Sequence, residues 1–457
     1  MRKSAIARLT AVTAGLMLAT LGTLNFGLGT RRVSAFSVLT VTNTNDSGAG
    51  SLRDAVNTAA SGDTIQFSLS LPATITLTTG EIPISKSLTI AGPGANLLTV
   101  SGNLSSRVFN IGVVPSATIS GLTMANGLAQ GIGGGILNQG NLSVTNCVFS
   151  DNSLNPGLTD GGAIATGFGA ALTIMGCTFT GNSATNVGSA VFASGGTVSV
   201  VNSTFSGNSG GADLFLAGAT VTVVNCTISG NSLNGILVFP MGTLNLQNTI
   251  VAGHTQGDCS TQGGSGGTIG VNSHNLIQDG SCSPMLSGNP MLGPLQNNGG
   301  PTPTMALLAG SPAIDAGDDS VLGSPLFLTT DQRGAGFPRN VGAHVDIGAF
   351  EVQAPAGPSF DTCLKDNTTG NLFQFNSTTG QYLFTRCADS FTLSGTGTVA
   401  LVNSMRTLKD IKADRKISAA FNNAQLTGSV TIYLKVAQGV WQLFQIHDTD
   451  PSAVCKC

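Results

Sequence analysis

The chain has 457 residues, of which only 9% are charged, and its formal net charge at pH 7 is −3. Typical soluble proteins have about 25% charged residues, and the scarcity of Glu, Lys and Gln here excludes a mainly helical protein. No basic surface is available for nucleic acid, so we expect no nucleic-acid partner. The 62 glycines, with abundant Val, Ile, Thr, Ser and Asn, favour short strands joined by tight turns.

The first 35 residues have the features of an export signal. Arg2, Lys3 and Arg8 precede an uncharged apolar stretch from Leu9 to Leu28, and small residues at 33–35 offer a cleavage site. An uncleaved membrane anchor is the alternative interpretation, although this stretch is only weakly apolar for a spanning helix. No later segment is long and apolar enough to span a bilayer. Nine cysteines also fit an oxidising compartment, so we expect a secreted or cell-surface protein.

Residues 36–87 are expected to form a cap at the N-terminal end of a repeat region. Within 46–67, Ser51 is placed to N-cap a short helix whose apolar stripe contains Leu52, Ala55 and Val56. Strand-like sequence comes after this helix. A cap is needed because stacked strands would otherwise leave an open edge at the beginning of the repeat region.

A repeated phrase dominates residues 88–288. The segments VTNCVFSDNS (144–153), IMGCTFTGNS (174–183), VVNSTFSGNS (200–209) and VVNCTISGNS (223–232) are related, and LNLQNTIVAGH (244–254) continues them. The first apolar residue of successive copies, with a weaker copy at 117, recurs after 25, 30, 26, 23 and 23 residues. Each period alternates like a strand, ends in a Gly-Asn-Ser turn and contains a second short apolar run. These features predict an all-β fold, a right-handed parallel β-helix with about seven or eight coils between residues 88 and 280.

Stacking assigns the recurring polar residues a structural role. Four asparagines share one register and are expected to form a ladder of amide hydrogen bonds: Asn152, Asn182, Asn208 and Asn231. Cys147, Cys177 and Cys226 share another register with Ser203 and Thr249 and should point into a narrow core. Metal or redox chemistry at these cysteines is disfavoured, because the register accepts Ser and Thr without disturbing the phrase.

The paired histidines near the end of the repeat suggest the best polar cluster. His254 with Asp258, and His274 with Asp279, lie four or five residues apart on successive coils. These groups are metal candidates if they converge, but two loop histidines without a ligand are the favoured interpretation. We therefore expect neither a metal nor a cofactor, and no pattern supports a calcium site.

An enzyme of the β-helix class would need a base or a carboxylate pair across a sugar bond. From Val108 to Gln332 the sequence has no Lys, Arg or Glu, and its nine Asp do not recur on one coil face. A carbohydrate-active enzyme, a polysaccharide lyase or glycoside hydrolase, therefore stays an alternative, which convergence of Asp151, Asp160 and Asp213 in one cleft would favour.

The repeated phrase and its regular spacing are absent from residues 289–353. The segments GPLQNNGGPTPTMALLAGSPAIDAG and TDQRGAGFPRNVGAHVDIGAFE resemble the choice-of-anchor Q region of bacterial surface proteins related to the polymorphic outer-membrane proteins. DSGAGSLRDAV near the N-terminus is similar to the opening of the same proteins, and the match covers roughly residues 38–353. The resemblance implies an exported right-handed β-helix and no assigned reaction. It also implies a Cys259–Cys282 disulfide, because two cysteines bracket a surface loop in that family.

A second polar set lies in this C-terminal segment and comprises Asp331, Arg333, Asp346 and Glu351. The expected role is structural, with Arg333 paired to a carboxylate that locks the segment.

Residues 354–359 read as a linker, and 360–457 as a small antiparallel β-domain with hairpins near 371–387 and 428–446. Two disulfides are expected among Cys363, Cys387, Cys455 and Cys457, with the pairing left open. Tyr382, Tyr433 and Trp441 are candidate binding aromatics, although each is at least as well explained by a small core.

Together these patterns favour an exported, non-catalytic β-helix scaffold or adhesin-like protein. We expect a monomer that binds an extracellular carbohydrate or protein ligand through its C-terminal domain.

Overall fold

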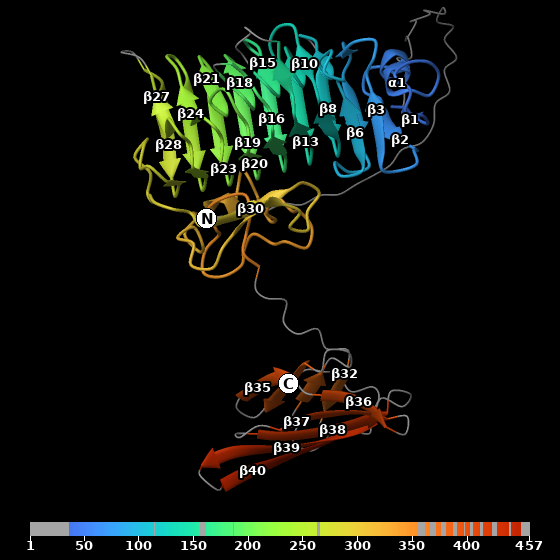
Figure 1. Cartoon of the computed structure of the whole chain (residues 1–457), viewed down its shortest axis with the longest axis vertical. Coiled ribbons are helices and arrows are strands. Elements are labelled where there is room, and N and C mark those ends of the chain that lie inside the picture. The colour runs from blue at the N-terminus through green and yellow to red at the C-terminus, as the bar shows by residue number, and fades with distance from the viewer. Residues whose placement is uncertain are drawn as a thin grey trace, which may run out of the picture.

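The computed structural model describes residues 36–353, apart from 114, 156–160, 186 and 263–265, together with the strands between 362 and 448. Residues 88–288 and part of the preceding segment form a parallel β-solenoid of three sheets, seen from the side in Figure 1. The sheets contain ten, nine and eight strands, which corresponds to about nine coils. The predicted fold class is confirmed. Between residues 88 and 280 each sheet has seven or eight strands, as the repeats predict, and strands before residue 88 lengthen the rod.

Each coil contributes one strand to each of three sheets, here named A, B and C. Sheet A comprises β1 (Val38–Val41), β2 (Thr64–Phe67), β5 (Leu88–Ala91), β8 (Ser116–Ser120), β12 (Asn141–Thr145), β16 (Ala171–Met175), β19 (Thr197–Val201), β22 (Thr220–Val224), β25 (Thr243–Gln247) and β28 (Thr268–Ser273). Sheet B comprises β3 (Ala73–Thr76), β6 (Leu98–Ser101), β9 (Thr123–Ala125), β13 (Val148–Ser150), β17 (Thr178–Thr180), β20 (Thr204–Ser206), β23 (Thr227–Ser229), β26 (Ile250–Ala252) and β29 (Leu276–Ile277). Sheet C comprises β4 (Ile82–Ile84), β7 (Phe109–Ile111), β11 (Ile136–Asn138), β15 (Ile164–Thr166), β18 (Val191–Ser194), β21 (Leu214–Ala217), β24 (Asn234–Val238) and β27 (Gly257–Thr261). A short pair, β10 (Leu128–Ala129) with β14 (Ser153–Leu154), lies outside these sheets.

The alternation read from the sequence places one set of side chains in the core. In β19, Val198 and Val200 are buried inside the coil, and each stacks on the equivalent residue of the next coil. The rings of Phe149, Phe179 and Phe205 lie in one column, with centroids 4.7 and 4.6 Å apart and nearly parallel planes. In-register stacking at the strand spacing explains why each coil repeats the residues of its neighbour.

The segment expected to be a cap already belongs in part to the solenoid. Strands β1 to β4 join the three sheets, so the rod begins within residues 36–87. The helix α1 (Leu52–Thr58) lies at this end of the rod (Figure 1), and the Ser51 hydroxyl accepts a hydrogen bond from the amide of Asp54. Leu52, Ala55 and Val56 are buried against the first coils, as the amphipathic pattern predicts.

The C-terminal segment packs along the corner where sheets A and B meet. It contains the antiparallel pair β30 (Leu292–Gln296) and β31 (Thr304–Leu307) and a short 3₁₀ helix, η1 (Asp319–Leu322). Val201 and Val224, which alternation turns outward from the coil, are buried beneath Val321, Leu328 and Val345 of this segment. None of the helices among the described residues is long and apolar enough to cross a membrane.

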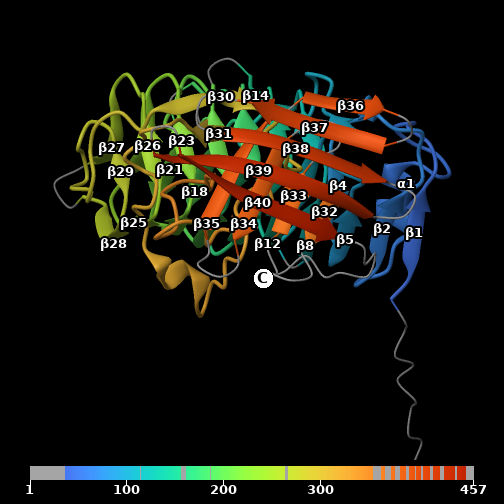
Figure 2. The same cartoon turned by 90° about the horizontal axis from the view of Figure 1, so that it is seen from below.

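The strands beyond residue 361 form two antiparallel sheets, labelled in Figure 2. One sheet contains β32 (Thr362–Lys365), β33 (Leu372–Phe375), β34 (Gln381–Arg386) and β35 (Phe391–Thr396). The other contains β36 (Thr398–Val402), β37 (Met405–Ile411), β38 (Arg415–Asn422), β39 (Thr427–Ala437) and β40 (Val440–Asp448). The predicted hairpins correspond to β33–β34 and β39–β40.

Candidate functional site

The asparagine register forms a buried ladder along the corner between sheets B and C. The side-chain Nδ2 of Asn152 donates to Oδ1 of Asn182 at 2.9 Å, and the same bond joins Asn182 to Asn208 at 3.0 Å and Asn208 to Asn231 at 3.3 Å. The amides also donate to backbone carbonyls of the preceding coils. A buried amide with these partners avoids the cost of an unsatisfied polar group.

The next rung of the ladder is His254. Thr227 pairs with Ile250 in the coil register, which places His254 beside Asn231, and the Asn231 Nδ2 lies 3.3 Å from the His254 Nε2. The ring lies between two carboxylates, with Nδ1 2.8 Å from Asp258 Oδ1 and Nε2 3.4 Å from Asp213 Oδ2. The His254 and Asp213 side chains are fully buried and that of Asp258 nearly so. The ladder therefore ends in a buried Asp–His–Asp cluster.

A glycine makes room for this ring. Asp213, Gly235 and Asp258 occupy equivalent positions immediately before the paired residues of β21, β24 and β27. A Cβ on Gly235 would lie 2.9 Å from Cε1 of His254. The missing side chain of Gly235 lets the imidazole reach the carboxylate of Asp213, which lies two coils earlier.

The positive charge of His254 and the negative charges of the two aspartates stabilise one another. Burial alone would lower the pKa of His254, but the hydrogen bonds and negative charges of Asp213 and Asp258 outweigh it and raise this pKa to about 9. Burial raises the pKa of Asp213, although its hydrogen bond and charge interaction with His254 oppose that shift. We assign an imidazolium at neutral pH, because both ring nitrogens face carboxylate oxygens and each needs a hydrogen to donate.

The two His–Asp pairs considered as a metal site do not converge. His274 occupies the turn between β28 and β29 with φ of 50°, and its Nδ1 lies 3.9 Å from Asp318 Oδ2. Asp279 instead accepts a hydrogen bond from the backbone N–H of Asp258. Among the described residues, no group of three His, Cys, Asp or Glu side chains is arranged to hold a metal ion. The convergent arrangement is therefore not found.

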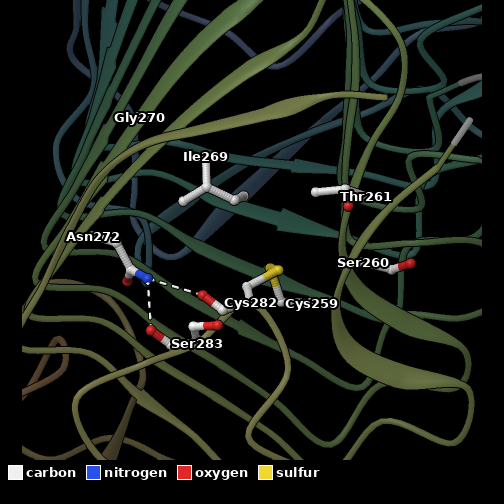
Figure 3. A pocket seen from close by; sticks show the side chains of 8 residues that line it. All are labelled: Cys259, Ser260, Thr261, Ile269, Gly270, Asn272, Cys282 and Ser283. Carbon is white, nitrogen blue, oxygen red and sulfur yellow. Dashed lines mark hydrogen bonds between the residues drawn. A yellow bond between two sulfur atoms is a disulfide. The ribbon is translucent and has the colours of Figure 1, made fainter. Parts of the chain in front are cut away.

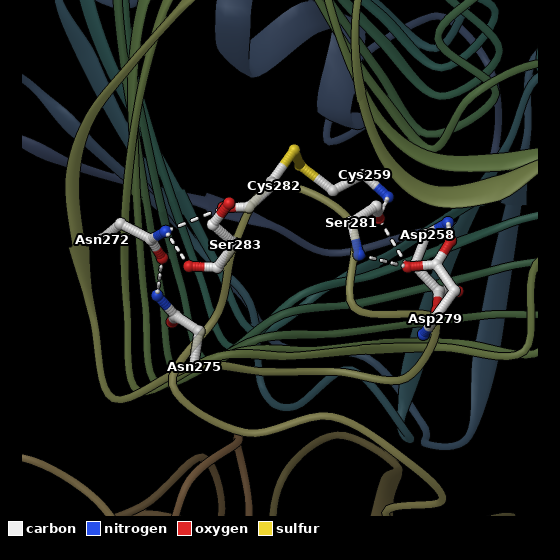
Figure 4. Close-up of a disulfide and its surroundings, with 8 residues drawn as sticks. All are labelled: Asp258, Cys259, Asn272, Asn275, Asp279, Ser281, Cys282 and Ser283. Carbon is white, nitrogen blue, oxygen red and sulfur yellow. Dashed lines mark hydrogen bonds between the residues drawn. A yellow bond between two sulfur atoms is a disulfide. The ribbon is translucent and has the colours of Figure 1, made fainter.

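Segment 278–283 closes the last coil (Figure 4). Cys259 and Cys282 form the expected disulfide, with Cα atoms 5.8 Å apart. The carboxylates of Asp258 and Asp279 each accept the backbone N–H of the other residue at 2.9 Å, and Ser281 accepts that of Cys259 at 3.0 Å. These contacts satisfy amides that an edge strand would otherwise expose.

A hollow of about 550 Å³ lies beside the disulfide (Figure 3). Its walls are Ser260 and Thr261 of β27, Ile269 and Asn272 of β28, and Ser283, together with the disulfide and Gly270. The Asn272 amide donates to the carbonyls of Cys282 and Ser283, so it also helps to hold the closing segment. No ionisable side chain lines this hollow among its described walls.

A second hollow, of about 420 Å³, lies where the C-terminal segment meets the last coil. It is lined by His274, Met285, Asp315, Ala316, Gly317, Asp318, Asp319 and His344. His344 Nδ1 lies 2.9 Å from Asp319 Oδ2, and both side chains are exposed. The N–H of Val345 and then the His344 side chain lower the pKa of Asp319. Sequence reasoning did not single out His344, which lies 70 residues beyond His274.

The outward face of sheet A is uncharged. Two adjacent rows of side chains along it are small and almost all polar: Thr64, Thr89, Thr118, Ser143, Thr173, Ser199, Thr222 and Asn245 in one row, and Ser116, Asn141, Ala171, Thr197, Thr220, Thr243 and Thr268 in the other. Within the described residues the one side-chain hydrogen bond among these positions joins Asn245 to Thr222. The remaining hydroxyls are available to an external partner.

Polar side chains fasten the C-terminal segment to the solenoid. Gln332 accepts a hydrogen bond from Thr204 Oγ1 at 2.6 Å, and its Nε2 lies 3.0 Å from Thr178 Oγ1. Three asparagines in left-handed turns of successive coils also bond to this segment: Asn202, Asn225 and Asn248. The outward threonines and turn asparagines of the repeat are thus the docking positions for residues that lie far away in the sequence.

The predicted structural role of Arg333 agrees with its contacts. Its guanidinium pairs with Asp331 at 2.6 Å and lies over the rings of Phe337 and Phe350. Arg339, which the sequence analysis did not single out, is fully buried and contacts Glu351 at 3.4 Å. Burial, followed by the charge of Asp346, raises the pKa of Glu351 to about 8. Burial also raises the pKa of Asp346.

The other sequence candidates take structural positions or lie outside the described residues. Cys147, Cys177 and Cys226 are free and buried, and burial raises the pKa of Cys226 to about 12. Asp213 is buried whereas Asp151 is an exposed turn residue, so these two do not line one cleft, and Asp160 lies outside the described residues.

In the C-terminal domain, Tyr382 is fully buried beside Phe373 with ring centroids 5.6 Å apart, so it belongs to the core and is not a binding aromatic. Tyr433 and Trp441 lie in β39 and β40. Their side chains, the predicted disulfides among Cys363, Cys387, Cys455 and Cys457, the linker and the export signal all fall outside what the structure describes.

Comparison with known families agrees with this architecture. Residues 98–273 match the family model described as a right-handed β-helix region. With the three parallel sheets, this match defines a β-helix repeat protein with right-handed coils. The matched range ends before the segment that resembles the choice-of-anchor Q region, so that resemblance stays a prediction. No curated protein and no solved structure matched the chain significantly.

Proposed function

We propose that this protein is an exported, non-catalytic β-helix scaffold with an adhesin-like role at the cell surface. The fold is compatible with a surface scaffold and with a carbohydrate-active enzyme. The observation that carries the proposal is the position of the ionisable groups. Along the described solenoid, His254, Asp213 and Asp258 are buried against one another, and the broad face of sheet A has no charge in its two central rows.

The sheet A face suits a neutral, hydrogen-bonding ligand. Its free hydroxyls repeat at the strand spacing of about 4.8 Å along the rod, and no charge favours an anionic or cationic polymer. A neutral glycan is therefore the ligand class we favour. The export signal expected in residues 1–35, the Cys259–Cys282 disulfide and the choice-of-anchor Q resemblance support a location outside the cytoplasm.

A glycan array with the purified full chain tests the binding proposal. Thr173→Arg and Thr220→Arg place a bulky charge on the sheet A face, and Gln130→Arg, at an exposed position outside the sheets, is the matched control. We expect glycan binding that the two sheet A variants lose and the control keeps. Absence of binding to any neutral glycan, or binding unaffected by both variants, would contradict this role for the face. Mass spectrometry of the mature N-terminus separately tests cleavage after Ala35.

The enzyme alternative has one specific observation in its favour. In the hollow beside the last coil, the His344–Asp319 pair leaves the His344 Nε2 without a partner among the described residues. A carboxylate-oriented imidazole is a general-base arrangement. Release of reducing ends from a polysaccharide, lost in His344→Ala and kept in Gln130→Arg, would replace the scaffold proposal by this one.

A further inference from the structure

Histidine replaces asparagine at one rung of the ladder, His254. The neighbouring positions in sheet C also differ there from those of the earlier coils. The positions beside the ladder are Ala163 and Ala190 in earlier coils, followed by Asp213, Gly235 and Asp258. Histidine, the two carboxylates and the glycine gap thus occur together, at the end of the rod. Four asparagine rungs precede this site, so the ladder itself does not require a histidine.

The geometry distinguishes the two protonation states of His254. A neutral imidazole has one N–H, whereas carboxylate oxygens lie 2.8 Å from Nδ1 and 3.4 Å from Nε2. Only the imidazolium donates to both. In the neutral ring with hydrogen on Nδ1, the Asn231 amide at 3.3 Å can donate to Nε2, but Asp213 then faces a lone pair. Its remaining side-chain partners are Ser189, at 3.1 Å, and Asn208.

The groups that face His254 come from three places. Asp213 precedes β21, Asp258 belongs to β27, and the neutral Asn231 follows β23. Asp279 reaches the cluster through the backbone of Asp258. No Lys, Arg or Glu occurs between Val108 and Gln332. Among the described residues of these elements, the histidine is therefore the one cation that compensates two buried carboxylates.

The cluster is joined directly to the closed end of the rod. Asp258 is followed by Cys259, and its carboxylate accepts the N–H of Asp279, two residues before Ser281. Loss of the imidazolium charge would leave buried carboxylates uncompensated, which is strongly destabilising in protein interiors. The resulting opening should begin in the coils that contain β21, β24 and β27.

We propose that the Asp213–His254–Asp258 cluster is an alkali-sensitive lock on the last coils of the solenoid. While His254 is charged, it holds three successive coils together. When it loses its proton, the terminal coils open locally, while the coils around β8 to β13 stay closed. The direction follows from linkage: a histidine whose pKa rises from 6.5 to about 9 on folding contributes stability below 6.5, which is lost as pH rises through 9.

Two measurements on the full chain test this proposal. In ¹⁵N NMR of the histidine rings, His254 should stay an imidazolium at about pH 8, where an unperturbed histidine is neutral. In hydrogen exchange corrected for intrinsic rates, protection of β21, β24 and β27 should fall by about tenfold per pH unit between pH 6.5 and about 9 and level off above that, while β8 and β12 stay protected. A neutral His254 ring at about pH 8, or equal pH dependence in both regions, would overturn the proposal.

Variants provide a matched control. His254→Asn supplies the residue of the other rungs but removes the charge, so the terminal coils should lose protection at neutral pH and show no alkaline transition. Asp213→Ala combined with His254→Asn reproduces the Ala and Asn of earlier coils and should regain part of that protection. An alkaline transition that persists in His254→Asn would refute the proposal. If that variant fails to fold, the NMR titration of the native chain still decides.

Discussion

Gln332 offers the sharpest test of how the C-terminal segment is held on the solenoid. Its side chain is buried and accepts a hydrogen bond from Thr204 at 2.6 Å. Gln332→Leu keeps the approximate volume but leaves the Thr204 hydroxyl without a partner. The hydroxyls of Thr178 and Thr302 still donate to the carbonyls of Pro303 and Gly176, at 2.6 and 2.8 Å. The unpaired Thr204 hydroxyl therefore accounts for most of the lost stability.

A buried polar group that loses its partner costs about 1–3 kcal/mol, whereas replacing both partners with apolar groups is nearly neutral. We therefore expect Gln332→Leu to lower the free energy of unfolding by about 2 kcal/mol. Adding Thr204→Val should restore most of that loss. Hydrogen exchange across 293–352, together with chemical denaturation, measures both effects. Gln130→Leu, at an exposed position outside the sheets, is the control and should change little.

The coupling between the two substitutions decides the interpretation. If the double variant is destabilised by the sum of the single variants, the Thr204–Gln332 bond does not hold the segment. The same conclusion follows if Gln332→Leu leaves exchange in 293–352 unchanged.

Three further predictions concern the core, the closed end and the buried charges. Phe179→Ala, which removes the middle ring of the stack, should lower the free energy of unfolding by about 3–5 kcal/mol in denaturation experiments. Phe168→Ala, at an exposed position, should change it little, and equal losses would contradict the stacking. Cys259→Ser with Cys282→Ser opens a loop that spans a sequence separation of 23 residues, and it should lower the free energy of unfolding by about 3 kcal/mol in the chain-entropy model. Unchanged hydrogen exchange in β27 and β28 would refute a role of the disulfide in closing the last coil. The raised pKa of Glu351 means that stability falls as pH rises from 4.5 through about 8. Glu351→Gln should flatten this dependence in thermal scans, and an unchanged slope would show that another group titrates there.

The repeat could be read from the sequence because stacking imposes the same residues at the same positions. Asn152 and its three equivalents fell in one register, and the structure places their amides in one ladder. The same count from Leu244 leads to His254, so the histidine could have been recognised as a fifth rung. Because the chemistry of histidine differs from that of asparagine, the sequence alone indicates a loop histidine or a metal ligand at this position.

The remaining contacts could not be predicted because no local pattern encodes them. Gln332 bonds to Thr178 across 154 positions and Arg339 to Asn202 across 137. The outward Thr204 looks like any solvent-facing residue of a strand, and only the folded C-terminal segment shows that it is buried. Likewise, strands β1 to β4 carry too little of the repeated phrase to reveal that they already belong to the three sheets.

The attachment of the C-terminal segment has a consequence for the length of the rod. The segment contacts Gly176, Asn202, Asn225 and Asn248, which lie in successive coils, so we expect that one coil more or one fewer between them would break these contacts. Among the described residues, no comparable segment contacts several of the earlier coils at once. Ser116 pairs in register with Asn141, so removal of residues 116–140 would join two equivalent points and shorten the rod by one coil. The number of coils beneath the C-terminal segment is therefore constrained by its contacts, whereas we expect the earlier coils to tolerate the removal of one repeat.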